Sequence, residues 1–252
     1  MRFAPIFKYR MRDCMISMGV VVLVMIALTA LCFFGIVTFG QIESSDGSGE
    51  VIMESTTMNF GMPVAIFMFV LSIVSIREDM RLGIQNGAGR GTSFAANTAC
   101  MLITAVAMNL TFFLLTLLWN QLDTGVYIVD IFGALYFGEP FLAGLGDLAV
   151  STAALLSLSV FLAALGVFTS LMYWRLNKAG KWIVSLGTGA VIILFVDVII
   201  RYEAIAKALG RFLDWLFTTP WNMALSFAVL AAAFYAFARL LVRRNAITAA
   251  TA

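Results

Sequence analysis

Histidine is absent from the 252-residue sequence, and cysteine occurs only three times. Without histidine, the chain cannot form a histidine-based catalytic triad, a histidine-ligated zinc site or a histidine proton relay. Cys14, Cys32 and Cys100 lie in or beside apolar runs, at spacings unlike those of metal sites. We interpret them as small buried hydrophobic residues, and the sequence predicts no metal site.

Charged residues are also scarce. They make up 12% of the chain, whereas hydrophobic residues make up 62% and the mean hydropathy is +0.98. Soluble domains contain about 25% charged residues, so a soluble chain with this composition would have too little polar surface. The net charge of +2 offers no basic field for nucleic acid. These properties indicate an integral membrane protein whose main partner is the lipid bilayer.

Charge-poor apolar runs recur six times along the chain. A helix needs about 20 apolar residues to cross the roughly 30 Å of hydrocarbon in a bilayer. The first run is far longer than the apolar part of a signal peptide, about 7–15 residues, so we expect it to remain as an anchor. The sequence therefore predicts an all-α integral membrane protein with one transmembrane domain, residues 1–252. The predicted spans are residues 14–40, 58–76, 93–119, 148–174, 182–200 and 219–238.

The lysines and arginines predict how the chain is oriented. Thirteen of the 16 lie at the two termini or in the second-to-third and fourth-to-fifth connections. Connections rich in lysine and arginine stay in the cytoplasm, so we expect both termini to be cytoplasmic. Residues 41–59 then form an outer connection, which we interpret as a flexible loop. Residues 120–147 form the next one, and their aromatic side chains favour the outer membrane interface.

Two segments are predicted to be amphipathic surface helices. Apolar side chains recur at helical spacing over the first 14 residues, with Lys8 and Arg12 on another face. Residues 201–217 show a similar pattern, and Glu203 and Lys207 are spaced for an i,i+4 ion pair. The second segment is either a specific feature of the fold or an ordinary interfacial anchor.

The connection after the second predicted span is charged and rich in glycine. A charged helical turn is followed by Asn-Gly-x-Gly-Arg, and the third span then begins. This connection, residues 77–92, resembles the first cytoplasmic loop of ABC type-2 exporter permeases, in which charged residues precede Asn-Gly-x-Ser-Arg. Gly89 and Gly91 stand where the family usually has serine and lysine. The site residues that the resemblance suggests are Arg77, Glu78, Asp79, Arg81, Asn86, Gly87, Gly89 and Arg90.

The resemblance implies a fold and a role for this connection. It implies an amino-terminal elbow helix, six spans, cytoplasmic termini and a short outer helix before the last span. Residues 77–92 would form a coupling helix that docks into a groove of a separate ATP-binding cassette subunit. The permease would be a homodimer or heterodimer in a bacterial cell membrane, and it would export a drug, peptide or lipid-like substrate.

The chain shows no nucleotide-binding motif of its own. Gly180 and Lys181 are followed by Trp182, not by the serine or threonine of a phosphate-binding loop. The resemblance therefore implies that ATP is bound and hydrolysed by the partner subunit. We expect this chain to carry no cofactor and to be a transport subunit, not an enzyme.

Other interpretations stay open. Residues 77–92 can be a polar loop that only follows the positive-inside rule. The chain can also be a non-transport assembly protein or a channel, although a channel is expected to show polar rings in its spans. Asp197 is either a functional acid within the membrane or the i,i+4 partner of Arg201. Asn97 and Asn109 are expected to form hydrogen bonds between helices.

Overall fold

The computed structural model describes residues 3–36, 40–45, 51–121, 126–129, 131–137 and 144–244. In this part of the chain, six helices are long and apolar enough to cross a membrane. They are α1 (Phe3–Phe33), α2 (Gly61–Gln85), α3 (Arg90–Asn120), α5 (Leu145–Arg175), α6 (Lys178–Arg201) and α8 (Pro220–Arg244). The predicted helical multi-pass membrane protein is confirmed, although residues 37–39 of the first predicted span lie outside the described residues.

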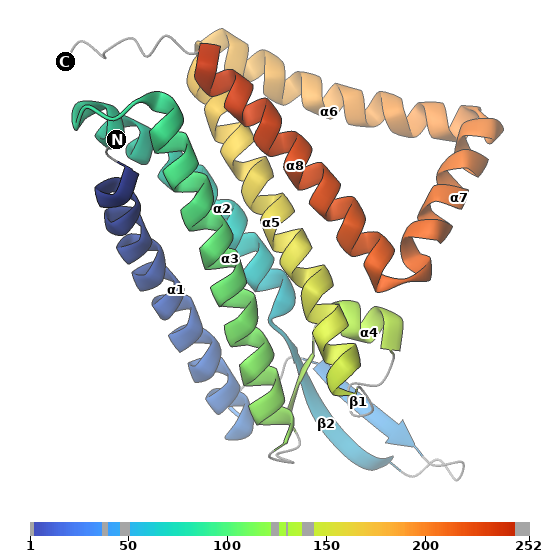
Figure 1. Cartoon of the computed structure of the whole chain (residues 1–252). Helices are drawn as coiled ribbons and strands as arrows, with labels where there is room; N and C mark the ends of the chain where they lie inside the picture. Colours follow the sequence, from blue (N-terminus) through green and yellow to red (C-terminus); the bar gives the residue numbers. More distant parts are fainter. Residues whose placement is uncertain are drawn as a thin grey trace.

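Five of these helices, α1, α2, α3, α5 and α8, form a bundle (Figure 1). The start of α1, the α2–α3 turn, the end of α5 and the end of α8 lie at one end of it. The basic segments of the sequence therefore gather at this end. Helices α1, α3 and α5 have 31 residues each, or about 46 Å at about 1.5 Å per residue. They are longer than the hydrocarbon layer is thick, so their ends project beyond it.

The opposite end of the bundle carries a three-stranded sheet (Figure 1). Strand β1 (Gly40–Ser45) pairs antiparallel with β2 (Val51–Asn59), and β2 pairs parallel with β3 (Val126–Val129). Asn120 holds β3 at the end of α3: its amide donates to the Ile128 carbonyl at 3.1 Å and accepts the Ile128 N–H at 3.0 Å.

The sheet corrects the interpretation of residues 41–59 as a flexible loop for residues 41–45 and 51–59, and residues 46–50 lie outside the described residues. The segment contains β-branched residues, which favour strands. Helical periodicity does not reveal strands this short, and the pairing of Thr56 with Val126 joins segments far apart in the sequence. Side-chain pattern alone could not show that pairing.

Close contact between α2 and α5 forms the centre of the bundle. A side chain at Gly166 would overlap the Ser72 hydroxyl and would lie 2.7 Å from the Phe69 carbonyl oxygen. Ser170 donates across the same interface to the Ile73 carbonyl at 3.0 Å. Small residues let membrane helices approach in this way, because packing and hydrogen bonds rather than water exclusion hold them together.

Phenylalanines join α5 to α8 on the other side. The rings of Phe161 and Phe227 stack at 5.6 Å between centroids, and those of Phe168 and Phe234 meet edge to face at 5.3 Å. Offset and edge-to-face arrangements are the favoured geometries of aromatic pairs. Helix α5 therefore contacts α2 through small residues and α8 through large ones.

Helix α1 is continuous from Phe3 to Phe33. The expected elbow helix is not a separate element, because its residues form the first turns of the same helix that makes the first predicted span. No proline or glycine interrupts the segment between Ile6 and Met18, so nothing in the sequence breaks the helix there. Helix α1 packs mainly against α3.

Helix α6 departs from the bundle. Figure 1 shows it starting beside the ends of α5 and α8 and running away from the other helices instead of alongside them. Its side chains are widely exposed, with Ile183 and Ile193 each 70% exposed. The fifth predicted span is thus helical but is not packed like the others. The helix is apolar on every side, so no face of it is selected for contact with the bundle.

Helix α7 (Glu203–Thr218) leads from α6 back to α8, and α4 (Ile131–Phe137) meets its end. The hydroxyl of Tyr136 donates to the Leu216 carbonyl at 3.3 Å, and burial raises the pKa of this phenol. The predicted ion pair between Glu203 and Lys207 is confirmed at 2.7 Å. The short helix expected before the last span is therefore present as α7.

Candidate functional site

The candidate site lies where the start of α1, the end of α2 and the start of α3 meet. Residues 77–85 are helical and form the last turns of α2, and Asn86 caps that helix. The Gly87 N–H donates to the Ile84 carbonyl, and the Ala88 N–H donates to the Gly83 carbonyl, each at 2.9 Å. This pair of bonds is a Schellman motif, which uses the last free carbonyls of a helix.

Glycine is needed at two points of this turn. Gly87 has a φ of +71°, which is in the left-handed region that other residues avoid. Gly83 faces Ser93 of α3, where an added Cβ would overlap the serine hydroxyl and lie 2.9 Å from its Cβ. Gly83, which is outside the set of residues that the resemblance suggests, therefore permits the close approach of α2 and α3.

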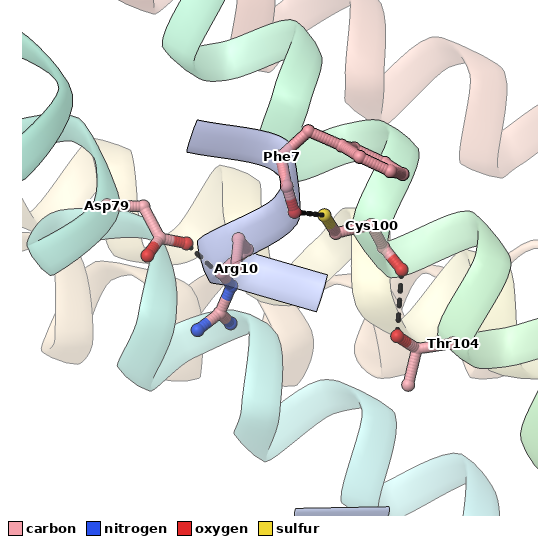
Figure 2. Close-up of polar contacts among 5 residues, drawn as sticks. All are labelled: Phe7, Arg10, Asp79, Cys100 and Thr104. Carbon is pink, nitrogen blue, oxygen red and sulfur yellow. Dashed lines mark hydrogen bonds and ion pairs between the residues drawn. The ribbon is translucent and has the colours of Figure 1, made fainter. Parts of the chain in front are cut away.

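An ion pair joins α1 to α2 beside this turn. The Nε atom of Arg10 lies 2.8 Å from Oδ2 of Asp79, and the two side chains are 9% and 8% exposed. Figure 2 shows the two side chains pointing toward each other from neighbouring helices. A buried charge is unfavourable unless it is paired, so each residue requires the other where it lies.

A second contact joins α1 to α3. The Cys100 thiol donates to the Phe7 carbonyl at 3.6 Å, and Thr104 donates to the Cys100 carbonyl at 2.8 Å (Figure 2). Cys14 and Cys100 are both free and fully buried, as the composition predicted. The first turns of α1 are thus attached to α2 through charge and to α3 through the cysteine.

Asp79 does not lie where the coupling hypothesis placed it. We expected Glu78, Asp79 and Arg81 to present their charges to a partner protein. Asp79 instead faces α1, whereas Glu78 and Arg81 are exposed. The reason is the helical periodicity of α2, which turns position 79 toward the bundle together with Met80 and Gly83.

The other predicted residues lie around the turn. Arg77 is exposed, and its guanidinium approaches the Ser170 carbonyl of α5 at 3.4 Å. Gly89 is the N-cap of α3, and Arg90 begins that helix. The end of α2 is therefore in contact with α1, α3 and α5.

Arg10 is the main residue of this site that the sequence analysis missed. A signal was present, since Arg10 is three residues after Phe7 and four before Cys14, on the apolar stripe of the segment. A charged side chain on the apolar stripe of a helix is buried, so it needs a buried partner of opposite charge. The sequence did not show which acid supplies it.

A cavity of about 530 Å³ lies next to the ion pair, between α1 and α2. Its volume is within the range of small-molecule pockets, about 300–1,000 Å³. Most of its walls are apolar, and the ion pair forms part of them. The lining residues are Pro5, Ile6, Tyr9, Arg10, Asp79, Leu82, Gly83 and Asn86.

The predictions for the polar residues of the spans are confirmed at two positions and wrong at a third. Asp197 pairs with Arg201 at 2.8 Å on exposed surface, which confirms the i,i+4 interpretation. Asn109 donates to the Ser159 hydroxyl of α5 at 3.2 Å, as predicted. Asn97 is buried, but neither amide atom has a partner among the described residues, so that prediction is wrong. The Asn109 amide also donates to the Ala105 carbonyl of its own helix at 2.8 Å. Ser159 on the facing helix supplies the interhelical partner of Asn109, and no described residue supplies one to Asn97.

The fold and site define a multi-pass helical membrane protein. At one end of its bundle, α1 and α5 contact the last turns of α2, and a cavity lies beside them. No family model matches the chain, and neither the curated proteins nor the solved structures contain a match.

Proposed function

We propose that this chain is the permease subunit of an ATP-driven exporter of the ABC type-2 class. It would lie in a bacterial cell membrane with both termini in the cytoplasm. The orientation is supported by the basic residues, which gather at the end of the bundle that carries the α2–α3 turn. At that end the turn faces the side where ATP is available.

The observation that carries the proposal is the construction of the α2–α3 turn. The end of α2 is tied to α1 by the Arg10–Asp79 ion pair and approaches α5 through Arg77. Force applied to a segment attached in this way moves several helices together, as a coupling element requires. A loop that only connected two spans would not need a buried ion pair at its base.

The exposed charges of the turn supply the contact surface. Glu78 and Arg81 point outward, and Gln85 and Gly87 beyond them are exposed. Polar groups of both signs suit a protein groove, where charge complementarity selects the partner. The partner would bind and hydrolyse ATP, and this chain would bind the substrate and change conformation.

A dimer fits the same proposal. Helix α6 exposes apolar side chains on every side, and lipid or another membrane helix must cover them. In a permease dimer the second subunit would cover part of this surface. The transported substrate would be a drug, peptide or lipid-like molecule.

The test is reconstitution with a candidate ATP-binding subunit. The chain purified alone should show no ATP hydrolysis, and with its partner it should form a complex of two permeases and two ATPases. Hydrolysis by the complex should increase with the exported substrate. Robust hydrolysis by the isolated chain, or failure of every candidate ATPase encoded beside it to bind, would contradict the proposal.

A second candidate function is that of a membrane assembly protein. The exposure of α6 favours it, because a helix apolar on all sides can associate with unrelated membrane helices. Co-purification separates the two functions. An assembly protein would bring down other membrane proteins without an ATPase, and its complexes would not respond to ATP.

A further inference from the structure

Two cavities lie along the boundary between α1 and α2, at different depths in the bundle. The first, about 530 Å³, contains the Arg10–Asp79 pair in its wall. The second, about 280 Å³, is lined mainly by apolar residues, among them Val20 and Val24 of α1 and Pro63 of α2. Because α1 packs mainly on α3, its side toward α2 is left partly open. We call this boundary the α1–α2 seam.

The first cavity has a cationic group with unused hydrogen-bonding capacity. Arg10 is 7% exposed, and its Nη2 atom has no hydrogen-bond partner among the described residues, while Nε faces Asp79. Buried N–H groups almost always have an acceptor, so the Nη2 group of Arg10 can donate a hydrogen bond to an acceptor on a ligand. Lys8 and Arg12 lie on another face of α1 and do not line this cavity, so Arg10 is the cationic group that a ligand would meet there.

The arrangement suits a phosphate group. Guanidinium groups bind phosphate oxygens through directed, charge-assisted hydrogen bonds. Asp79 already balances the charge of Arg10. The site therefore suits a singly charged phosphodiester better than a group of higher charge. Basic pockets between membrane helices at headgroup level are typical binding sites for anionic lipids.

The second cavity suits an acyl chain. Val20 lies ten residues beyond Arg10 on the same helix, about 15 Å further along the axis at about 1.5 Å per residue. That distance is within the reach of a phospholipid tail. The walls near Val24 and Pro63 are almost entirely apolar, and the side-chain oxygen of Asn59, which also lines the cavity, accepts the Gly61 N–H at 3.0 Å.

We propose that the α1–α2 seam is a binding site for an anionic phospholipid. Its phosphate contacts Arg10 in the first cavity, its glycerol region passes Ile6 and Leu82, and one acyl chain follows the seam to Val20 and Val24. The leaflet is the one at the end of the bundle that holds the α2–α3 turn. This site does not depend on the proposed transport function.

Site-specific photocrosslinking tests the proposal. The full chain, with benzoylphenylalanine in place of Leu82, is placed in nanodiscs of equal phosphatidylglycerol and phosphatidylcholine and irradiated, and the adducts are identified by mass spectrometry. The matched control has the same amino acid at Leu102, since the two leucines are 40% and 39% exposed. We expect several-fold more phosphatidylglycerol than phosphatidylcholine at position 82 and no preference at position 102.

Two variants test the chemistry of the site. Arg10→Gln should abolish the preference for phosphatidylglycerol at position 82. Ile6→Trp fills the cavity and leaves both members of the ion pair in place, so it should lower the yield of every adduct there if the chain elutes as the folded protein. An unchanged adduct in both folded variants would overturn the proposal.

Other results of the crosslinking would also contradict the proposed phospholipid site. Equal adducts of the two lipids at position 82, or the same preference at position 102, would mean ordinary boundary lipid. Loss of the adduct on addition of soluble glycerol phosphate would assign the cavity to a free phosphate and exclude the acyl part. In cell membranes, a protein adduct in place of a lipid adduct would assign the cavity to a partner subunit.

Discussion

Arg10 and Asp79 form a buried ion pair, with Nε and Oδ2 2.8 Å apart, that joins the first turns of α1 to the last turns of α2. The pair brings together two segments that the sequence suggests for different reasons, an amphipathic amino terminus and a charged connection. It also forms part of the wall of the larger cavity. The stability of this end of the bundle and the behaviour of the turn therefore depend on the same two residues.

Removing the charge of Asp79 should destabilise the protein strongly. Asp79→Asn leaves Arg10 buried without a counter-charge, and breaking a buried pair in this way costs about 3–5 kcal/mol. The free energy of unfolding can be measured by titrating the micelle-bound protein with SDS. The matched control is Asp197→Asn, which removes the same charge from an ion pair on exposed surface. Exposed pairs contribute about 0–1 kcal/mol.

The exchange Arg10→Asp with Asp79→Arg separates charge from geometry. It restores an opposite pair, so the double variant should be more stable than either single variant. Equal losses for Asp79→Asn and Asp197→Asn would show that the Arg10–Asp79 pair is hydrated in the membrane-bound protein.

The α2–α5 contact should be intolerant of a methyl group. Gly166→Ala places Cβ against the Ser72 hydroxyl and 2.7 Å from the Phe69 carbonyl oxygen, which is backbone and cannot rotate away. Overpacking of this kind costs about 1–3 kcal/mol, which the same SDS titration would measure. Gly187→Ala on α6 has nothing within 4 Å and should be neutral or slightly stabilising, because alanine favours helix. A neutral Gly166→Ala would mean that α2 and α5 lie further apart.

Single cysteines should report which end of the bundle is cytoplasmic. In a background with Cys14, Cys32 and Cys100 replaced by alanine, Gly91→Cys places a thiol at an exposed position with open space around it. Gln121→Cys places one at the opposite end of α3. An impermeant thiol reagent added to intact cells should label position 121 and leave position 91 unmodified until the membrane is opened. The reverse pattern would invert the proposed orientation and remove the turn from the side of an ATPase.

Reversing the exposed charges of the turn should weaken its contact with an ATPase. Glu78→Lys with Arg81→Glu keeps the net charge and leaves Asp79 in its ion pair, so the fold should be retained. Like charges would then face each other across the interface. We expect about a tenfold loss of affinity, equal to about 1.4 kcal/mol, measured by co-purification and by substrate-stimulated hydrolysis.

The matched control for this reversal is Glu203→Lys with Lys207→Glu. It exchanges another exposed pair, on α7 away from the turn. That variant should bind the ATPase as the unmodified chain does. If both double variants bind normally, residues 77–92 are only a solvated connection.

The exposed ion pairs and the membrane spans follow from local sequence. Asp197 and Arg201 are four residues apart on one helix, so their spacing alone predicts the pair that the structure shows. The spans were predictable for a similar reason. The thickness of the bilayer sets the length that an apolar run needs to span it, so spans can be predicted without knowing which helices touch.

Contacts between distant segments were decided only by the tertiary structure. Nothing near Arg10 indicates that its partner is Asp79, since the choice depends on how α1 lies against α2 and on which way each helix is turned. The pairing of Thr56 with Val126 and the close approach at Gly166 have the same origin. Helix α6 is the reverse case: its sequence strongly predicts a membrane helix but selects no packing face, because all of its faces are apolar. Local hydropathy therefore determined which segments are helices, and the fit between particular side chains decided how they meet.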